Sequence, residues 1–170
     1  RRPVDFAQRA RLLDQIDGRL AEGAAARLAL AREVSAPAQL TDGRAKLLLL
    51  RACLQFRRER PQLFAAGEYL PLAADGTHSD HVVAFARRSG EDIAICVAPR
   101  LLLALLEPGG DAPAPGFIDW RGTLRLPKEL ARSYQHVVTG ENFDATTGAL
   151  ELGTCFNSFP VAVLRSGSNR

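Results

Sequence analysis

The hydrophobic pattern of the chain changes its period close to residue 67. Between residues 41 and 60, apolar residues recur at steps of three and four, which is the spacing of one face of an α-helix. That face comprises Ala45, Leu48, Leu49, Ala52, Cys53 and Phe56, widened by Leu47, Leu50 and Leu54. We expect the longest helix of the chain here, capped by Thr41 or Asp42 and ended by Pro61.

The residues before this stretch also predict helices. Pro3 and Asp5 suit the start of a first helix, and Gly18 should weaken its middle by about 1 kcal/mol relative to alanine. A second helix is expected over residues 24–34, ended by the turn at residues 35–37. A helical piece of roughly 60 residues closes its own core poorly. Its apolar faces therefore need another layer, either the following strands or a part of the protein that precedes this chain.

Beyond residue 67 the pattern alternates with a period of two, which predicts strands. We expect them at residues 68–72, 81–88, 92–99, 118–126, 134–139, 149–152 and 161–165. The short turn at residues 89–91 makes the second and third a hairpin, and the apolar run 81–86 favours a central place for the second. Residues 101–106 fit a strand or a helical turn equally well, and residues 127–131 predict a helical turn.

These elements predict an α+β fold, with N-terminal helices followed by an antiparallel β-sandwich or barrel. We place the boundary between a helical segment, residues 1–66, and a β-sandwich domain, residues 67–170. The length of 170 residues suits one large domain or two small ones. A hydrophobic fraction of 46% excludes the disordered classes.

Charge and composition add little about function. The net charge of +3 favours solubility and does not by itself indicate a nucleic-acid partner. No apolar run approaches the ~18 residues of a membrane span, so no membrane partner is expected. The chain contains no Met, from which we expect it to be a piece of a longer protein.

Three cysteines, Cys53, Cys96 and Cys155, lie far apart beside apolar residues. An odd count without a C-x-x-C pair argues against a disulfide framework or a zinc site. They are interpreted as small buried thiols in a reducing compartment, which predicts a cytoplasmic protein.

Polar residues with catalytic potential do not assemble into a recognisable motif. His78 and His81, near Asp75 and Asp80, have the spacing of a metal corner, but they lie in a polar loop without a second ligand pair. His136 is interpreted as a packing residue in a strand. Neither a nucleophile elbow nor a phosphate-binding loop is present. We therefore expect no metal, no cofactor and no active site formed by this chain alone.

Two sets of residues suggest binding roles. Aromatic rings stack on sugars, so Trp120, Tyr69 and Tyr134 are candidate contacts of a stand-alone α-glucan-binding module, although a lone Trp in a sandwich is more often a core residue. A basic interaction surface is the other alternative, and a solvated helix end is the simpler interpretation of its residues, Arg51, Arg57, Arg58 and Arg60.

Several motifs, in the same order along the chain, resemble the maltooligosyltrehalose synthases of the α-amylase superfamily. Residues 1–6, Arg-Arg-Pro-Val-Asp-Phe, are similar to the end of a run typical of that family. Residues 42–47 and 57–64 resemble its last barrel helix, and residues 67–72 resemble the exit from that helix. Residues 80–87 resemble the next strand. The matches to its C-terminal sheet are Trp120 and residues 123–127, 138–140 and 159–164. Residues 24–35 and 109–116 match no motif of the family.

The resemblance implies a parent enzyme that converts the reducing-end α-1,4 link of maltooligosaccharides to an α,α-1,1 link. It implies a retaining mechanism with three carboxylates in an upstream (β/α)8 barrel, so we assign no catalytic residue to this chain. Arg1, Arg2 and Asp5 would lie nearest the substrate, where a guanidinium orients hydroxyls, or would form a salt bridge at a helix start.

The role implied for the chain itself is structural: it would pack against the barrel, steady the floor of the cleft and be inactive alone. Separated from the barrel, its apolar helix faces should form an oligomer or an adhesive patch.

Overall fold

The helical part of the chain begins at a capped helix, as predicted. The computed structural model describes all residues except 1–3, 37–38, 40–41, 106–117 and 168–170. The side chain of Asp5 accepts a hydrogen bond from the Gln8 amide at 2.8 Å and so caps α1 (Phe6–Ala21). Gly18 does not interrupt this helix. A turn at Glu22 and Gly23 leads into α2 (Ala24–Ser35), which confirms the second predicted helix.

The predicted long helix is α3 (Arg44–Glu59), followed at once by the short α4 (Pro61–Ala65). Asp42 accepts a hydrogen bond from the first helical amide, that of Arg44, at 2.8 Å, while Thr41 lies outside the described residues. The buried side of α3 carries Leu48, Ala52 and Phe56, as the periodicity predicted. Leu50 and Leu54, which widen the apolar face, are 47% and 61% exposed. The apolar face of α3 is therefore wider than the surface that covers it.

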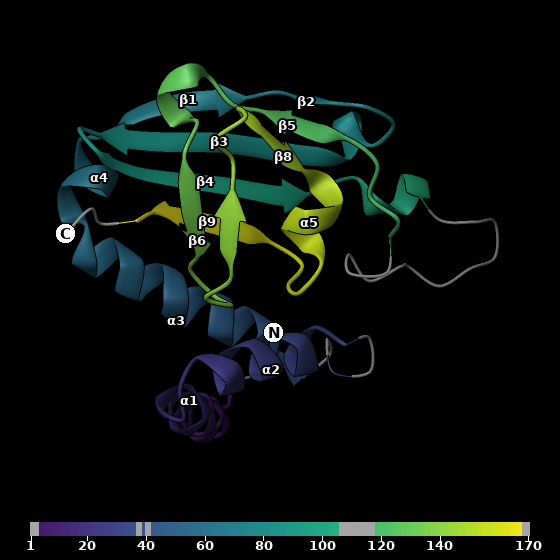
Figure 1. Cartoon of the computed structure of the whole chain (residues 1–170). Helices are drawn as coiled ribbons and strands as arrows, with labels where there is room; N and C mark the ends of the chain where they lie inside the picture. Colours follow the sequence, from purple (N-terminus) through teal and green to yellow (C-terminus); the bar gives the residue numbers. More distant parts are fainter. Residues whose placement is uncertain (1–3, 37–38, 40–41, 106–117, 168–170) are drawn as a thin grey trace.

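A six-stranded antiparallel sheet follows the helices (Figure 1). Its strands, in spatial order, are β1 (Glu68–Leu72), β3 (Val82–Ser89), β4 (Asp92–Pro99), β9 (Ala162–Ser166), β6 (Ser133–His136) and β7 (Asn142–Asp144). The β3–β4 hairpin pairs Ser89 with Asp92, which confirms the predicted turn. β3 lies between β1 and β4, in the internal position that its apolar run predicted.

A smaller antiparallel sheet packs over one face of the large one. It is formed by β2 (Ala74–Asp75), β5 (Thr123–Arg125) and β8 (Ala149–Glu151). The core between the sheets contains side chains from both, among them Ile95, Val97, Leu124 and Leu150. Figure 1 shows α5 (Leu152–Phe156) beside β8, and Phe156 of this helix completes the core. The α+β fold with antiparallel strands is thus confirmed.

The opposite face of the large sheet is covered by the helices. Leu48, Phe56 and Leu63 pack with Ala94 of β4 and Phe159 in a second apolar cluster. Figure 1 shows α3 running under the sheet, with α2 and α1 beyond it. The strands therefore supply part of the layer that the N-terminal helices required. The switch from helix to strand falls between Ala65 and Glu68 as expected, whereas the division into two domains stays a prediction.

Two predicted strands were too long. Only Thr123–Arg125 of residues 118–126 form a strand, because Gly122 has a φ of +149° and a Cβ there would lie 2.5 Å from the Asp75 carbonyl oxygen. The strand expected at 134–139 ends at His136, whose Nδ1 accepts hydrogen bonds from the Val138 and Thr139 amides and turns the chain. These side-chain and backbone contacts leave no trace in the hydrophobic period.

The remaining differences concern short elements. The sequence did not predict β2, β7, α4 or α5, which are too short to establish a period. Residues 101–106 fit either a strand or a helical turn by sequence, and Leu102–Leu105 form a 3-10 turn. A second 3-10 turn at Lys128–Leu130 agrees with the prediction, and a third lies at Ser79–His81. Among the described residues, no helix is long and apolar enough to cross a membrane.

Candidate functional site

The start of the chain contributes to an open groove. This groove, of about 570 Å³, lies between the first turns of α1 and α3 and is lined by Val4, Asp5, Leu12, Lys46, Leu47 and Leu50, among others. Arg1 and Arg2, two of the predicted substrate-adjacent residues, lie outside the described residues. The third, Asp5, is exposed and caps α1. A role for Asp5 beside a substrate stays a prediction.

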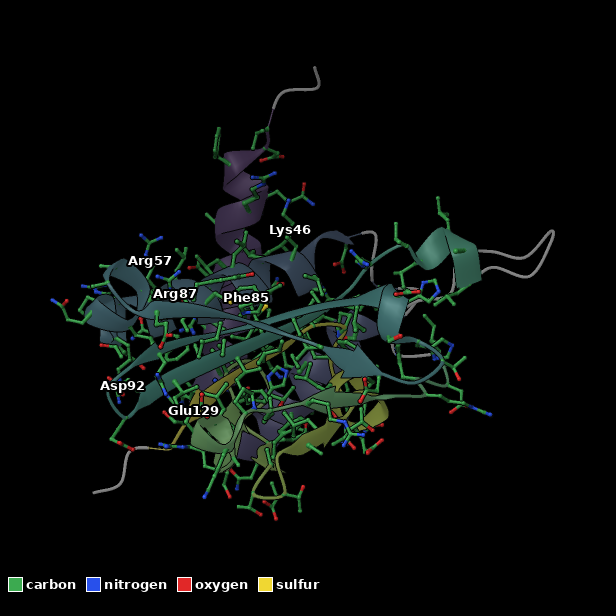
Figure 2. All side chains as sticks on the ribbon, turned by 90° about the horizontal axis from the view of Figure 1, so that it is seen from above. Lys46, Arg57, Phe85, Arg87, Asp92 and Glu129 are labelled. Atoms are coloured by element: carbon green, nitrogen blue, oxygen red, sulfur yellow. The ribbon has the colours of Figure 1, made fainter. Side chains whose placement is uncertain are left out.

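Tyr69 has a solvent-exposed aromatic ring. It lies on β1 and is 55% exposed, stacked at 5.2 Å and 27° on Phe85 of the neighbouring β3. Arg87, two residues after Phe85 on β3, donates hydrogen bonds to the carbonyl oxygens of Leu63 and Gly67 (Figure 2). These bonds join β3 to the end of α4. Tyr69 is thus held against a rigid support, in a position where a flat apolar ligand has access.

Trp120 and Tyr134, the other aromatic candidates, belong to the core between the sheets. Trp120 is 7% exposed, with its ring centroid 4.8 Å from that of Phe156. Tyr134 is 2% exposed, and its hydroxyl donates to the Leu130 carbonyl oxygen at 2.6 Å. Burial raises the pKa of Tyr134 to about 12. The structure therefore does not bring the three aromatic candidates together, and only Tyr69 has an exposed ring.

Of the two neighbouring histidines, His78 is held by a hydrogen bond, whereas Nδ1 of His81 is buried without a hydrogen-bond partner among the described residues. Nδ1 of His78 accepts a hydrogen bond from the Arg121 amide at 2.9 Å, and the rings of His78 and His81 are 6.2 Å apart. Within the described part of the chain, no group of three or more His, Cys, Asp or Glu side chains is placed to hold a metal ion.

The cysteines are unreactive by environment. Cys155 is buried, and burial raises the pKa of its thiol to about 12. Cys96 and Cys53 are half-buried, and burial raises the pKa of both, to about 11 for Cys96. All three are free thiols. Because the thiolate is the nucleophilic form, these pKa values keep the cysteines inert near neutral pH.

The arginines of the predicted basic surface do not share one environment. Arg51 forms an ion pair with Asp17 of α1, and Arg60 with Asp92 of β4 at 3.1 Å. Arg57 and Arg58 are exposed near the end of α3. An interaction role for these arginines remains a prediction.

The sequence did not single out a pocket of arginines between the helices and the sheet. Arg27 of α2 and Arg165 of β9 meet Arg51 of α3 there. His136, predicted as a packing residue, is 2% exposed, contacts Phe143 and Phe159, and also shapes the turn that borders this pocket. The arginines come from distant parts of the chain, and no local spacing connects them.

Comparison with known proteins gives a consistent result. No protein-family model matches the chain. Two proteins named maltooligosyl trehalose synthase, from Mycobacterium tuberculosis strains CDC 1551 and H37Rv, are each 35% identical over 119 residues, 70% of this chain. The structure of a mutant of maltooligosyltrehalose synthase from Arthrobacter ramosus superimposes with a TM-score of 0.63 and 32% identity over 97% of the chain.

The chain spans 13% of the length of the mycobacterial proteins and 17% of that of the Arthrobacter structure. The sequence comparison and the superposition give similar identities, 35% and 32%, to proteins of the same name. They confirm the resemblance seen in the ordered motifs. This chain is a relative of the maltooligosyltrehalose synthases and corresponds to one segment of these longer enzymes.

Proposed function

We propose that the chain is the C-terminal part of an enzyme that converts the reducing-end α-1,4 link of maltooligosaccharides to an α,α-1,1 link. The observation that supports this most is the superposition of 97% of the chain on a maltooligosyltrehalose synthase at 32% identity. The reaction is an intramolecular glucosyl transfer, an isomerisation. Its catalytic carboxylates would lie upstream, in a barrel, and the enzyme would be cytoplasmic.

Within that enzyme, this segment serves a structural role. The apolar face of α3 is only partly covered by the sheet, and Leu50 and Leu54 are about half exposed or more. The groove beside them adds Val4, Leu12 and Leu47. Exposed apolar surface of this kind is typical of a docking interface. The catalytic barrel is the proposed occupant, because the relatives are several times longer than this chain.

Activity assays separate the two parts of the proposal. A protein extended to the length of the relatives is expected to form trehalose-terminated products from maltopentaose, and the 170-residue chain alone to form none. Absence of such products from the extended protein would refute the reaction. Product formed by the pure chain would refute the structural role.

A double substitution tests the docking surface. Leu50→Asp with Leu54→Asp should be nearly neutral in the chain alone, because both side chains are exposed there. In the extended protein the same change should cost several kcal/mol, since an unpaired buried charge is strongly destabilising. Leu103→Asp is the control, because Leu103 is 76% exposed on a different element. Equal effects of the double substitution in both proteins would contradict docking at α3.

A stand-alone α-glucan-binding module is the second candidate, supported by the open Tyr69–Phe85 stack. Titration with maltoheptaose should then show saturable binding that Tyr69→Ala abolishes and Leu103→Ala preserves. An absence of binding by the unmodified chain would remove this candidate and leave the first unaffected.

A further inference from the structure

A small pocket lies where the helices meet the sheet, and its lining is unusually rich in positive charge. The cavity has a volume of about 60 Å³ and is bordered by α2, α3, β9 and the turn that follows β6. Figure 1 shows the loop between β6 and β7 pointing toward α3. Its charged lining residues are three arginines, Arg27, Arg51 and Arg165, and one acid, Glu59.

Arg27 carries the charge that its surroundings do not balance. Its Nε donates to the Val138 carbonyl oxygen at 2.8 Å, and its Nη2 donates to the Val137 carbonyl oxygen. Both acceptors are neutral, and no ion pair of Arg27 is present among the described residues. Desolvation by burial lowers the pKa of Arg27, and the nearby charges of Arg165 and Arg51 lower it further, against a smaller opposing effect of Glu59.

The other two arginines already have acidic partners. Arg51 is paired with Asp17, and Arg165 with Glu59 at 3.3 Å. The two pairs cancel in charge, and one positive charge remains on the half-buried Arg27. A half-buried cation whose hydrogen-bond acceptors are neutral is stabilised further when an anion binds beside it.

The pocket is held in shape without a ligand. Nε2 of His136 donates to the Val161 carbonyl oxygen, with the two atoms 3.1 Å apart, because its Nδ1 is an acceptor. Nδ1 accepts from the Val138 and Thr139 amides at 3.0 and 3.2 Å, which fixes the two carbonyl groups that orient Arg27. A Cβ at Gly140, which has a φ of +80°, would lie 3.5 Å from Cδ of Arg27. A pre-formed charged pocket loses little entropy on binding.

We propose that this pocket is a binding site for a small oxyanion group, a phosphate or a carboxylate, with Arg27 as its main contact and Arg51 and Arg165 beside it. Planar guanidinium groups recognise both groups through paired hydrogen bonds. The cavity exceeds the space needed for a single water, about 10–15 Å³ by the same kind of measure. A bound anion would connect α2 and α3 to β9, and would brace the helical layer on the sheet.

The test titrates the chain with inorganic phosphate, and separately with acetate, at constant ionic strength maintained with chloride. The expected result is a saturable change in the amide NMR signals of Val138, Thr139 and Gly140, with a rise in Tm as the site fills. Saturation by either anion supports the site and tells phosphate from carboxylate recognition. A response to neither, or an equal response to chloride, would overturn the proposal.

Matched variants locate the site. Arg51→Gln removes one charge from the pocket without touching the Val137 and Val138 carbonyls, and should weaken binding about tenfold. Arg27→Lys keeps the charge and loses the planar fork, and should weaken it by a similar factor while the chain stays folded. Arg57→Gln removes the same charge from the exposed end of α3 and should leave binding unchanged. Equal weakening by Arg57→Gln would show a diffuse charge effect and refute the site.

Discussion

The two faces of the six-stranded sheet are covered in different ways. On the face toward the small sheet, the buried residues are almost entirely apolar, and the Tyr134 hydroxyl is satisfied by a backbone carbonyl. On the helical face, the apolar cluster is smaller and is bordered by Arg27 and Arg165. The helix furthest from the sheet, α1, buries only Ile16 among its described residues.

This difference indicates which layer stabilises the fold and which layer is poised to interact. Apolar burial is the dominant favourable term in folding, so the core between the sheets should determine the global stability. The helical layer has a smaller apolar cluster and is also held by hydrogen bonds and ion pairs. Its exposed leucines leave an apolar surface that a partner could cover. Perturbations of the two layers should therefore differ in the size of their effects, and three predictions follow in decreasing order of effect.

Phe156→Ala should have the largest effect. The Phe156 side chain is 1% exposed and contacts Trp120 in the core between the sheets. Its truncation is expected to lower the free energy of unfolding by about 3–5 kcal/mol, because it removes apolar burial and leaves a cavity. Urea unfolding followed by fluorescence measures this, since Trp120 is the sole tryptophan and reports on the same core. Leu54→Ala, on the exposed side of α3, is the control and should change stability by less than about 0.5 kcal/mol.

Acidification should act at the end of β6 through His136. Burial lowers the pKa of His136 from 6.5 to about 4, with a raising contribution from Glu141 and a lowering one from Arg27. The unfolded chain then binds the proton more readily than the folded chain, so the stability is fully present above about pH 6.5. It should be lost progressively as the pH falls toward 4, by about 3 kcal/mol in total.

Above about pH 5, the carboxyl groups with lowered pKa values contribute little to the loss. The lowered pKa values of Asp42 and Asp144 add their own losses only at lower pH, where carboxyl groups become protonated. Urea unfolding from about pH 7 to 5 should show roughly 2 kcal/mol of the loss in the unmodified chain. The slope should disappear in His136→Gln, and an unchanged slope in that variant would assign the effect to other groups.

The layers differ also in how far the sequence predicted them. The hairpin of β3 and β4 and the buried side of α3 followed from periodicity, because each has enough residues to repeat its pattern. The ends of the strands at Gly122 and His136 did not, because they depend on a close approach to Asp75 and on ring hydrogen bonds across a turn. The hydrophobic periodicity of the sequence indicates which face of an element is buried. It does not indicate where a tertiary contact ends a strand.

The candidate sites were predicted less well than the fold. Trp120 and Tyr69 were suggested together, yet one lies between the sheets and the other on an exposed edge strand. Arg27 and Arg165 were not suggested at all, since the pocket joins residues more than a hundred positions apart. The ordered motifs did indicate the family, because recognising them requires only a likeness to the sequences of relatives and no knowledge of the contacts.

Gly18→Ala should give the smallest change, and its location tells whether the two layers unfold together. Gly18 is exposed inside α1, and a Cβ there would meet no atom within 4 Å. Alanine should therefore stabilise the helix by about 0.5–1 kcal/mol. Gly67→Ala is the opposite control, because its Cβ would lie 2.2 Å from the Leu63 carbonyl oxygen and should destabilise the junction of α4 and β1. If α1 unfolds with the sheets, the gain of Gly18→Ala appears in the global unfolding free energy. If α1 opens by itself, the gain is confined to hydrogen exchange of its own amides, as its single buried residue leads us to expect.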